Sequence, residues 1–301
     1  MKKSFVFRLG ATFLGLAAVA AALAVTGGEK TVSAQVALPS PLRFVSQLDL
    51  KCYKTPGPLA LNQPLTLRHL NPVLQQLGLP PEYVVVRELQ ETCVPVAKNN
   101  VIPDASVLPF ARFVDLACYR IDAPPPTSAV NLVLTHLNPV LRQLGVPLEG
   151  VTLGKAQQLC VPVAKNNLVP PADILRVVQH IDLKCYEVNP PASLNKTLNI
   201  RHLNPLLAGL PPENNFVTNR QQLCVPVAKN NQPIPPDVLN IIRWLDLEKF
   251  QIQAPPLPNP VPLTLRHLNP LLVNWPQSQV SLYQANALLV PVAKNNQIPP
   301  G

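Results

Sequence analysis

Seven residues, Val-Pro-Val-Ala-Lys-Asn-Asn, occur four times in this chain, at 94–100, 161–167, 225–231 and 290–296. Their starts lie 67, 64 and 65 residues apart. Two other markers keep the same order and period. An Asp-Leu pair begins at Asp49, Asp115, Asp182 and Asp246, and a His-Leu-Asn-Pro segment begins at His69, His136, His202 and His267. Three markers at one common period indicate a unit repeated four times.

The period divides the chain into a leader and four units. We assign 1–34 to a signal peptide, 39–104, 105–172 and 173–236 to repeats 1 to 3, and 237–301 to a cysteine-free repeat 4. The leader has a basic start, an apolar run over 9–25 and small residues before Gln35, the expected mature N-terminus. Retention as a membrane anchor is the alternative, although the 17 residues of that run are at the lower limit for a span.

Composition narrows the fold class. Proline accounts for 38 of the 301 residues, a density that excludes long helices and long central strands. Hydrophobic residues make up 47% and charged residues 14%, so the chain is too apolar for a disordered segment. We expect a β-rich, small α+β tandem repeat, in which each unit of about 65 residues combines short strands with a helix of one or two turns. So small a unit needs a crosslink or a neighbour for stability.

The second strand of each unit and the helix after it have the clearest pattern. In 65–69 apolar and polar residues alternate, which places His69 on the apolar face of a strand. Asn71 is then a helix N-cap, Pro72 suits the first helical position, and Gly78 ends the helix. The pattern therefore predicts structural histidines and capping asparagines at His69, Asn71, His136, Asn138, His202, Asn204, His267 and Asn269.

The other segments of a unit are less regular. The residues 50–54 indicate a short strand, and 84–86 a separate short apolar stretch. The last strand contains a proline, Pro95 in repeat 1, and is therefore expected at an edge or to be irregular. The segment 237–245, before the Asp-Leu pair, has helical spacing, with a strand as the alternative.

Six cysteines fall two to a unit. The pairs are Cys52 and Cys93, Cys118 and Cys160, and Cys185 and Cys224. In repeat 4, Lys249 and Leu289 stand at the two positions, so both partners are missing together. We therefore predict one disulfide within each of the first three repeats, among the fifteen connectivities that six cysteines allow. A metal site is the competing interpretation, but no Cys-x-x-Cys motif or closely spaced histidine pair supports it, and we expect no metal or cofactor.

Two sets of repeated residues are candidates for function. Four histidines at one position suggest a metal or catalytic site, and would converge if the units closed into a ring. The strand pattern favours instead buried imidazoles that are hydrogen-bonded to local backbone. The four lysines before Asn-Asn are candidate binding residues, because lysines at loop tips would form a row of positive charges: Lys98, Lys165, Lys229 and Lys294. A solvated lysine before a turn also needs no function.

Charge and motifs exclude several function classes. The formal net charge is +9, and the leader, with four basic residues and one acidic residue, leaves +6 on the mature chain. These charges are evenly spread and show no basic run, so we expect no nucleic-acid partner. The repeated aspartates are isolated, one per unit, and no nucleophile elbow or phosphate-binding loop is present. We therefore expect that the chain is not an enzyme.

The segments Cys52-Tyr53-Lys54 and 159–166, Leu-Cys-Val-Pro-Val-Ala-Lys-Asn, resemble an uncharacterised family of secreted bacterial repeat domains. That family brackets each unit with a Cys-Tyr-Lys strand and a Leu-Cys-Asn-Pro-Val-x-Lys-Asn strand. Two departures, His-Leu-Asn-Pro in place of an Asp-Gln-Phe-like step and Val in place of Asn after the second cysteine, indicate a distinct subgroup. The resemblance implies export and a disulfide-bonded β-rich unit, with no activity attached.

These observations lead to an expected function and two alternatives. We expect a secreted, non-enzymatic repeat protein, located outside the cell or in the periplasm, that is a structural or cell-surface interaction module of unknown ligand. One alternative is a module that binds an anionic glycan or cell-wall polymer through the repeated lysines. The other is an enzyme or metal protein with a site at the repeat interfaces. The partner is unknown. An anionic surface polymer and another extracellular protein are the candidates, and we expect no membrane contact once the leader is cleaved.

Overall fold

The computed structural model describes residues 36–301, which form one compact unit. The signal peptide expected at 1–34 lies outside these residues. No helix in the described part of the chain has the length and apolar character needed to cross a membrane.

The described residues contain thirteen strands and seven short helical segments. The strands are β1 (Asp49–Lys54), β2 (Ala60–His69), β3 (Glu82–Lys98), β4 (Leu116–Asp122), β5 (Val130–His136), β6 (Glu149–Lys165), β7 (Leu183–Asn189), β8 (Ser193–His202), β9 (Glu213–Lys229), β10 (Asp246–Gln253), β11 (Val261–His267), β12 (Ser278–Leu282) and β13 (Ala285–Lys294). The helices are α1 (Pro41–Val45), α2 (Pro72–Gln76), α3 (Leu108–Ala111), α4 (Pro139–Gln143), α5 (Ala172–Val178), α6 (Pro236–Ile242) and the 3₁₀ turn η1 (Pro270–Leu272). The expected β-rich class is confirmed.

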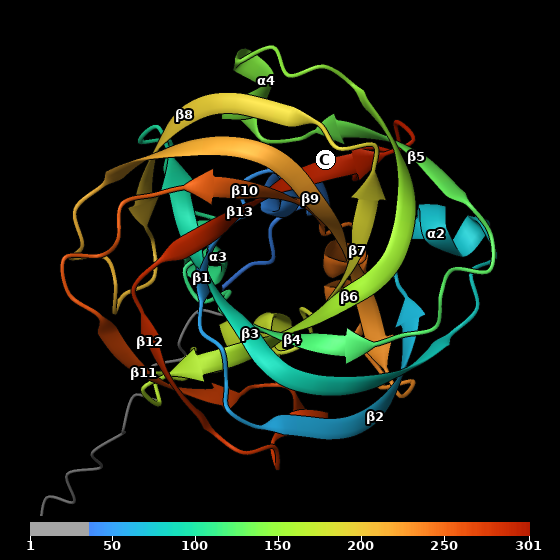
Figure 1. Ribbon diagram of the computed structural model, residues 1–301, viewed down its shortest axis with the longest axis horizontal. Coiled ribbons are helices and arrows are strands. Elements are labelled where there is room, and N and C mark those ends of the chain that lie inside the picture. The colour runs from blue at the N-terminus through green and yellow to red at the C-terminus, as the bar shows by residue number, and fades with distance from the viewer. Residues whose placement is uncertain (1–35) are drawn as a thin grey trace, which may run out of the picture. The chain divides into compact units, whose positions relative to one another are not determined.

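Eight strands form a closed antiparallel ring, which Figure 1 shows from one end. Their order is β1, β3, β4, β6, β7, β9, β10 and β13, and β13 pairs with β1 to close the ring. The strands β1, β4, β7 and β10 start at or next to the four Asp-Leu pairs, and β3, β6, β9 and β13 contain the four Val-Pro-Val-Ala segments. The chain is therefore closed on itself and is not an extended rod.

Strands outside this ring connect segments that are distant in the sequence. The strand β2 pairs with β3 of its own repeat and, at its end, with β9, where Leu67 lies opposite Lys229. Reciprocally, β8 pairs with β9 and with the end of β3, where Ile200 lies opposite Lys98. The strands β5 and β11 make the equivalent pairings with β13 and β6. Each repeat is thus hydrogen-bonded to the repeat two positions along the chain.

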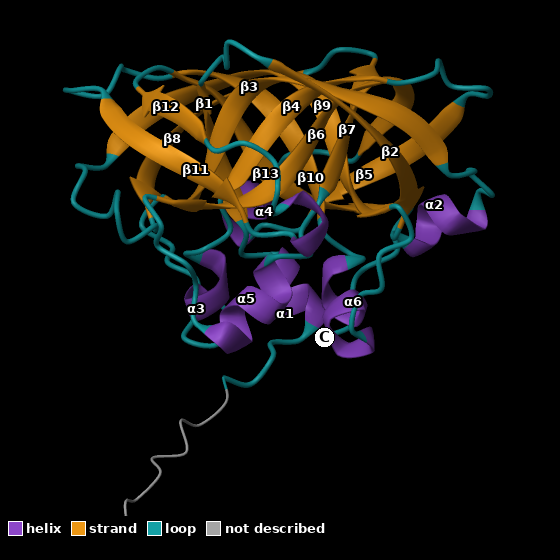
Figure 2. Ribbon diagram, turned by 90° about the horizontal axis from the view of Figure 1, so that it is seen from below, coloured by secondary structure: helices purple, strands orange, loops and turns teal. Residues whose placement is uncertain are grey.

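Short helices gather at one end of the ring (Figure 2). The helices α1, α3, α5 and α6 precede the first strand of each repeat, and α6 shows that 237–245 begins as a helix. The helices α2 and α4 and the turn η1 follow β2, β5 and β11. Their N-caps are Asn71, Asn138 and Asn269, whose side chains accept hydrogen bonds from the backbone N–H two residues on, as the sequence pattern predicts. Asn204 accepts the same bond from Leu206, although no helix follows.

The long strands differ from the expectation in three respects. The strands β3, β6 and β9 have 17 residues each and lie within the ring, so the prediction that proline excludes long central strands is wrong. Residues 84–86 do not form a separate stretch, because they belong to the 17-residue strand β3, whose ladder accommodates bulges. Pro95 does not lie at an edge, since β3 is paired on both sides. Its nitrogen lies in the gap between two partner strands, since the first residue of β4 is opposite Cys93 and the last residue of β8 is opposite Val96, so the ladder needs no N–H there.

The apolar side chains form two clusters. The larger one includes residues from both the ring and the outer strands, such as Leu67, Val96 and Leu198. The smaller one joins the six cysteines to helix residues such as Phe44 and Phe110. Because successive strand residues point to opposite faces, the two clusters occupy the two faces of the ring strands.

Candidate functional site

The four candidate binding lysines are buried at the ends of the long strands. Each is at most 1% exposed and forms an ion pair with the aspartate of the Asp-Leu pair in its own repeat: Lys98 with Asp49, Lys165 with Asp115, Lys229 with Asp182, and Lys294 with Asp246. The expectation of lysines at exposed loop tips is therefore wrong. The left-handed turn starts one residue later, at Asn99 and Asn100, so the lysine still belongs to the strand.

Each of these aspartates also binds the capping asparagine of the next repeat. Asn138 Nδ2 donates to Asp49 Oδ2 at 2.8 Å, while Asn138 Oδ1 accepts the N–H of Val140 at 2.9 Å. The other contacts are Asn204 to Asp115 at 2.6 Å, Asn269 to Asp182 at 3.2 Å and Asn71 to Asp246 at 2.6 Å. The last contact joins repeat 1 to repeat 4. The three sequence markers therefore meet in four buried Asp-Lys-Asn groups.

Burial acts against ionisation in these groups, and the ion pair opposes it. In repeat 1, burial raises the pKa of Asp49 and lowers the pKa of Lys98, while each charge partly offsets the effect on the other. Because the ammonium group of Lys98 is enclosed with its carboxylate, it is not available to an anionic ligand. The same holds for the other three lysines, so the anionic-polymer alternative loses the residues on which it depended.

Three of the four repeated histidines bind a tyrosine hydroxyl. The pairs are His69 with Tyr186 at 2.7 Å, His202 with Tyr53 at 2.7 Å, and His267 with Tyr119 at 2.9 Å, measured from Nε2 to Oη. In each pair the tyrosine belongs to the repeat two positions along. The histidines are buried, as expected, but the predicted bond to local backbone is wrong, because the outer strands end beside the ring strands of that distant repeat.

The fourth histidine has a different surrounding. His136 packs on Phe250, which stands where the other repeats have tyrosine, with 6.1 Å between ring centroids, and its Nε2 lies 3.7 Å from the Glu248 carboxylate. Burial, together with Lys98 and Arg220, lowers the pKa of His136 to about 4. The histidines do lie between repeats, but they do not converge in one site, since each contacts its own aromatic partner.

Charged side chains that the sequence patterns did not identify lie beside these aromatic pairs. Between repeats 1 and 3, Lys51 forms an ion pair with Glu213, and Lys184 forms one with Glu82. Between repeats 2 and 4, Glu248 stands at the position of Lys51 and Lys184, and it lies near Glu149 with Arg220 beside both carboxylates. Burial and the neighbouring Glu149 carboxylate raise the pKa of Glu248 well above its usual range.

The predicted pairing of the cysteines is confirmed. The disulfides are Cys52–Cys93, Cys118–Cys160 and Cys185–Cys224, each between residues directly opposite on neighbouring ring strands. They lie next to one another, since Cys93 Sγ is 3.6 Å from Cys118 Sγ and Cys160 Sγ is 3.9 Å from Cys185 Sγ. Glu91 approaches Cys52 and Cys93, but sulfurs bonded to each other provide no thiolate for a metal.

A buried polar cluster replaces the missing fourth disulfide. Lys249 Nζ donates to Glu91 Oε2 at 2.5 Å and to Gln158 Oε1 at 3.0 Å, and Asn286 Nδ2 donates to Glu91 Oε1 at 2.5 Å. These residues lie on β10, β3, β6 and β13, of which β3, β6 and β10 are not neighbours, so the contacts cross the interior of the ring. Every charge in this cluster has a partner.

Comparison with protein-family models, with curated proteins and with solved structures gave no match.

Proposed function

We propose that this chain is an exported, non-enzymatic protein in which four copies of one unit close into a single body that acts as a structural or cell-surface interaction module. One observation carries the proposal. The aspartates and lysines that recur in every repeat are buried in ion pairs that connect segments of the fold, and the recurring histidines are buried as well. Residues kept in every copy thus stabilise the fold and are not presented to a substrate.

Two further features support a location outside the cytoplasm. Three buried disulfides are typical of proteins that fold in an oxidising compartment. The leader sequence has the composition of a signal peptide. The resemblance to secreted bacterial repeat domains agrees with both and stays a prediction.

The intact mass of the exported protein tests this proposal. We expect a chain that begins near Gln35, has no bound metal and is about six daltons lighter before reduction than after it, because three disulfides remove six hydrogens. Native and denaturing spectra should give the same mass for the monomer. A retained leader, free thiols or a bound metal ion would contradict the proposal.

A further inference from the structure

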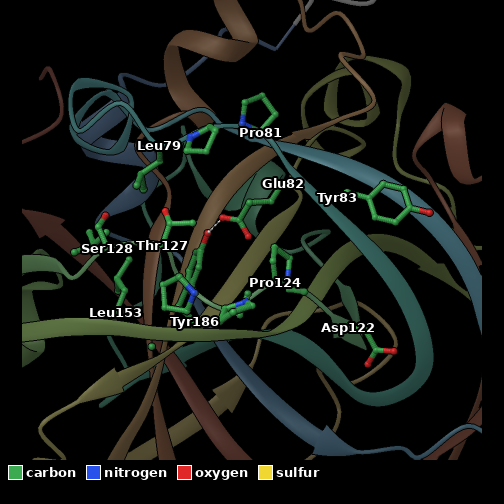
Figure 3. A pocket seen from close by; sticks show the side chains of 17 residues that line it. Leu79, Pro81, Glu82, Tyr83, Asp122, Pro124, Thr127, Ser128, Leu153 and Tyr186 are labelled. Carbon is green, nitrogen blue, oxygen red and sulfur yellow. Dashed lines mark hydrogen bonds between the residues drawn. The ribbon is translucent and has the colours of Figure 1, made fainter.

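An apolar groove lies between two loops at the side of the ring strands (Figure 3). One wall is the loop before β3, with Leu79, Pro80 and Pro81, and the other is the proline-rich loop after β4. The cavity has a volume of about 540 Å³, within the range of pockets that hold small organic molecules. Leu153 and Ala156 of β6 and the ring of Tyr186 also line it.

The groove is open because Ala156 is small and no side chain from a neighbouring loop fills the space beside it. The corresponding places in the other three repeats are different. Ala156 lies four residues before a strand cysteine, where repeat 3 has Arg220 and repeat 1 has Leu89. Arg220 lines the corresponding cavity and donates to the carbonyl of Pro190 at 2.6 Å, so that cavity carries a guanidinium. Leu89 is covered by the loop at Gly57, whose N–H donates to the Leu89 carbonyl at 2.9 Å.

Repeat 4 fills the corresponding place in another way. Its residue at this position is Ala285, also small, but the neighbouring loop inserts Leu257, which is only 4% exposed. The N–H of Leu257 is hydrogen-bonded to the carbonyl of Tyr283 at 3.0 Å, which holds the loop against the sheet. Among these four corresponding places, the one at Ala156 therefore combines an open cavity with an apolar lining.

The polar groups of the groove define the charge of a ligand. Glu82 lines the groove, and its Oε1 accepts a hydrogen bond from the hydroxyl of Tyr186 at 3.0 Å (Figure 3). The carboxylate is also paired with Lys184. Asp122 at the rim is paired with Arg87 and Arg120. Because both carboxylates are neutralised, the groove attracts neither anions nor cations strongly, but Glu82 retains acceptor capacity for one more hydrogen bond.

The walls of the groove are rigid. Five prolines line it: Pro80, Pro81, Pro124, Pro125 and Pro126. Proline fixes one backbone dihedral angle, so these loops lose little conformational freedom when a ligand binds. The exposed ring of Tyr83, 62% accessible, stands at the rim and adds aromatic surface.

We propose that this groove binds an uncharged, mainly hydrocarbon small molecule that carries one hydrogen-bond donor, oriented toward Glu82. The inference rests on the proposed role as an interaction module and specifies the chemical class of its ligand. The hydrocarbon part fills the cavity between the proline loops and Leu153. The donor binds the free acceptor site of the Glu82 carboxylate beside Tyr186.

A fluorescence titration with N-phenyl-1-naphthylamine tests this assignment, because this dye is uncharged and has two aromatic groups and one N–H. We expect saturable binding of one dye per chain with a micromolar Kd. Thr127→Trp, at the exposed rim, and Ala156→Leu, at the base, should each weaken binding at least about tenfold. Ser193→Trp is the matched control, since Ser193 is the exposed residue at the same position of the Arg220 cavity, and it should leave the Kd unchanged.

Two outcomes would overturn the assignment. One is the absence of saturable binding to folded protein, and the other is an unchanged Kd in Thr127→Trp, which alters only an exposed residue and should fold. Charge is tested with 1-anilinonaphthalene-8-sulfonate, whose rings are the same but carry a sulfonate, and which should bind at least about tenfold more weakly. Equal binding of both dyes would refute the preference for an uncharged ligand. The intact-mass measurement does not depend on this result, so the two proposals fail separately.

Discussion

The Asp-Lys-Asn groups show how single residues hold this molecule closed. A buried ion pair does not by itself add much stability, because desolvation offsets the attraction, but the loss of one partner leaves an uncompensated buried charge. Here the asparagine adds a hydrogen bond to the same carboxylate and caps the next helix. Each group therefore connects two strands of one repeat to the asparagine-capped turn of another, which begins a helix in three of the four cases.

Replacement of one lysine should expose this dependence. Lys229→Met leaves the buried Asp182 with only Asn269 as a partner, and we expect a loss of about 3–5 kcal/mol in the free energy of unfolding at neutral pH. Asp182→Asn in the same chain should recover most of it. Urea unfolding measures both, with the exposed Lys155→Met as a control that should stay within about 0.5 kcal/mol of the parent. A Lys229→Met chain as stable as this control would contradict the role of the pair.

Local signals predicted some of these residues and missed others. The cap at Asn71 was predicted correctly from the residues next to it. The pairing of Cys52 with Cys93 was predicted correctly because both cysteine positions are lost together in repeat 4. The burial of Lys98 was not predicted, because its partner Asp49 lies far away in the sequence and becomes its neighbour only when the strands pair. No local pattern distinguishes a lysine at the end of a buried strand from one in a loop.

At the level of elements, three outer strands, β2, β8 and β11, are attached to the ring by histidine-tyrosine bonds. The end of β11 carries His267, which meets Tyr119 of β4, although these strands belong to repeats 4 and 2. The sequence predicted the strands and the face of the histidine correctly. The sequence did not indicate the tyrosine, because the alternation of residues along one strand does not show which other strand packs against its histidine.

This contact should make stability depend on pH. Burial and Lys229 lower the pKa of His267 to about 4, below its ordinary value of about 6.5. Between these values the unfolded chain binds a proton that the folded chain does not, so the stabilisation that His267 provides decreases as the pH falls. The destabilisation caused by His267→Gln should therefore be smaller at pH 5.5 than at pH 7.5, by about 1 kcal/mol.

Urea unfolding of the parent and of His267→Gln at the two pH values measures this difference. His202→Gln provides a second test, since burial, Lys51 and Lys165 lower the pKa of His202 to about 3, and the same sign is expected. A difference between parent and variant that is equal at both pH values would show that the folded state tolerates the protonated imidazole.

For the molecule as a whole, ring closure makes the point at which the chain starts less important than the cyclic order of the repeats. The strand β13 pairs with β1, and the N–H of Leu42 donates to the carbonyl of Pro300 at 2.9 Å, so segments close to the two ends of the described chain are adjacent. The sequence left open whether the units form a rod or a ring. The ring is established by pairings between distant segments, such as β2 with β9. Neither segment contains a local pattern that identifies its partner.

A circular permutant should therefore fold. We expect a chain that starts at Pro233, in the link between β9 and α6, and joins Gly301 to Val36 through a short flexible linker, to be monomeric and to melt within about 5 °C of the parent. Circular dichroism and gel filtration test this. Removal of 233–301 is the control, because it deletes β10 and β13 and leaves unpaired edges on β1 and β9, which should cause aggregation. Failure of the permutant would show that closure does not make the termini interchangeable.

The reciprocal pairing of opposite repeats also has a consequence for the time course of folding. Contacts such as Leu67 with Lys229 span more than half of the described chain, and β13 at the end of the sequence completes the ring with β1 at its start. Such a topology has a high contact order, and high contact order is associated with slow folding. The native ring cannot form before the last strand has been synthesised, so we expect the chain to complete its fold only after its synthesis is finished.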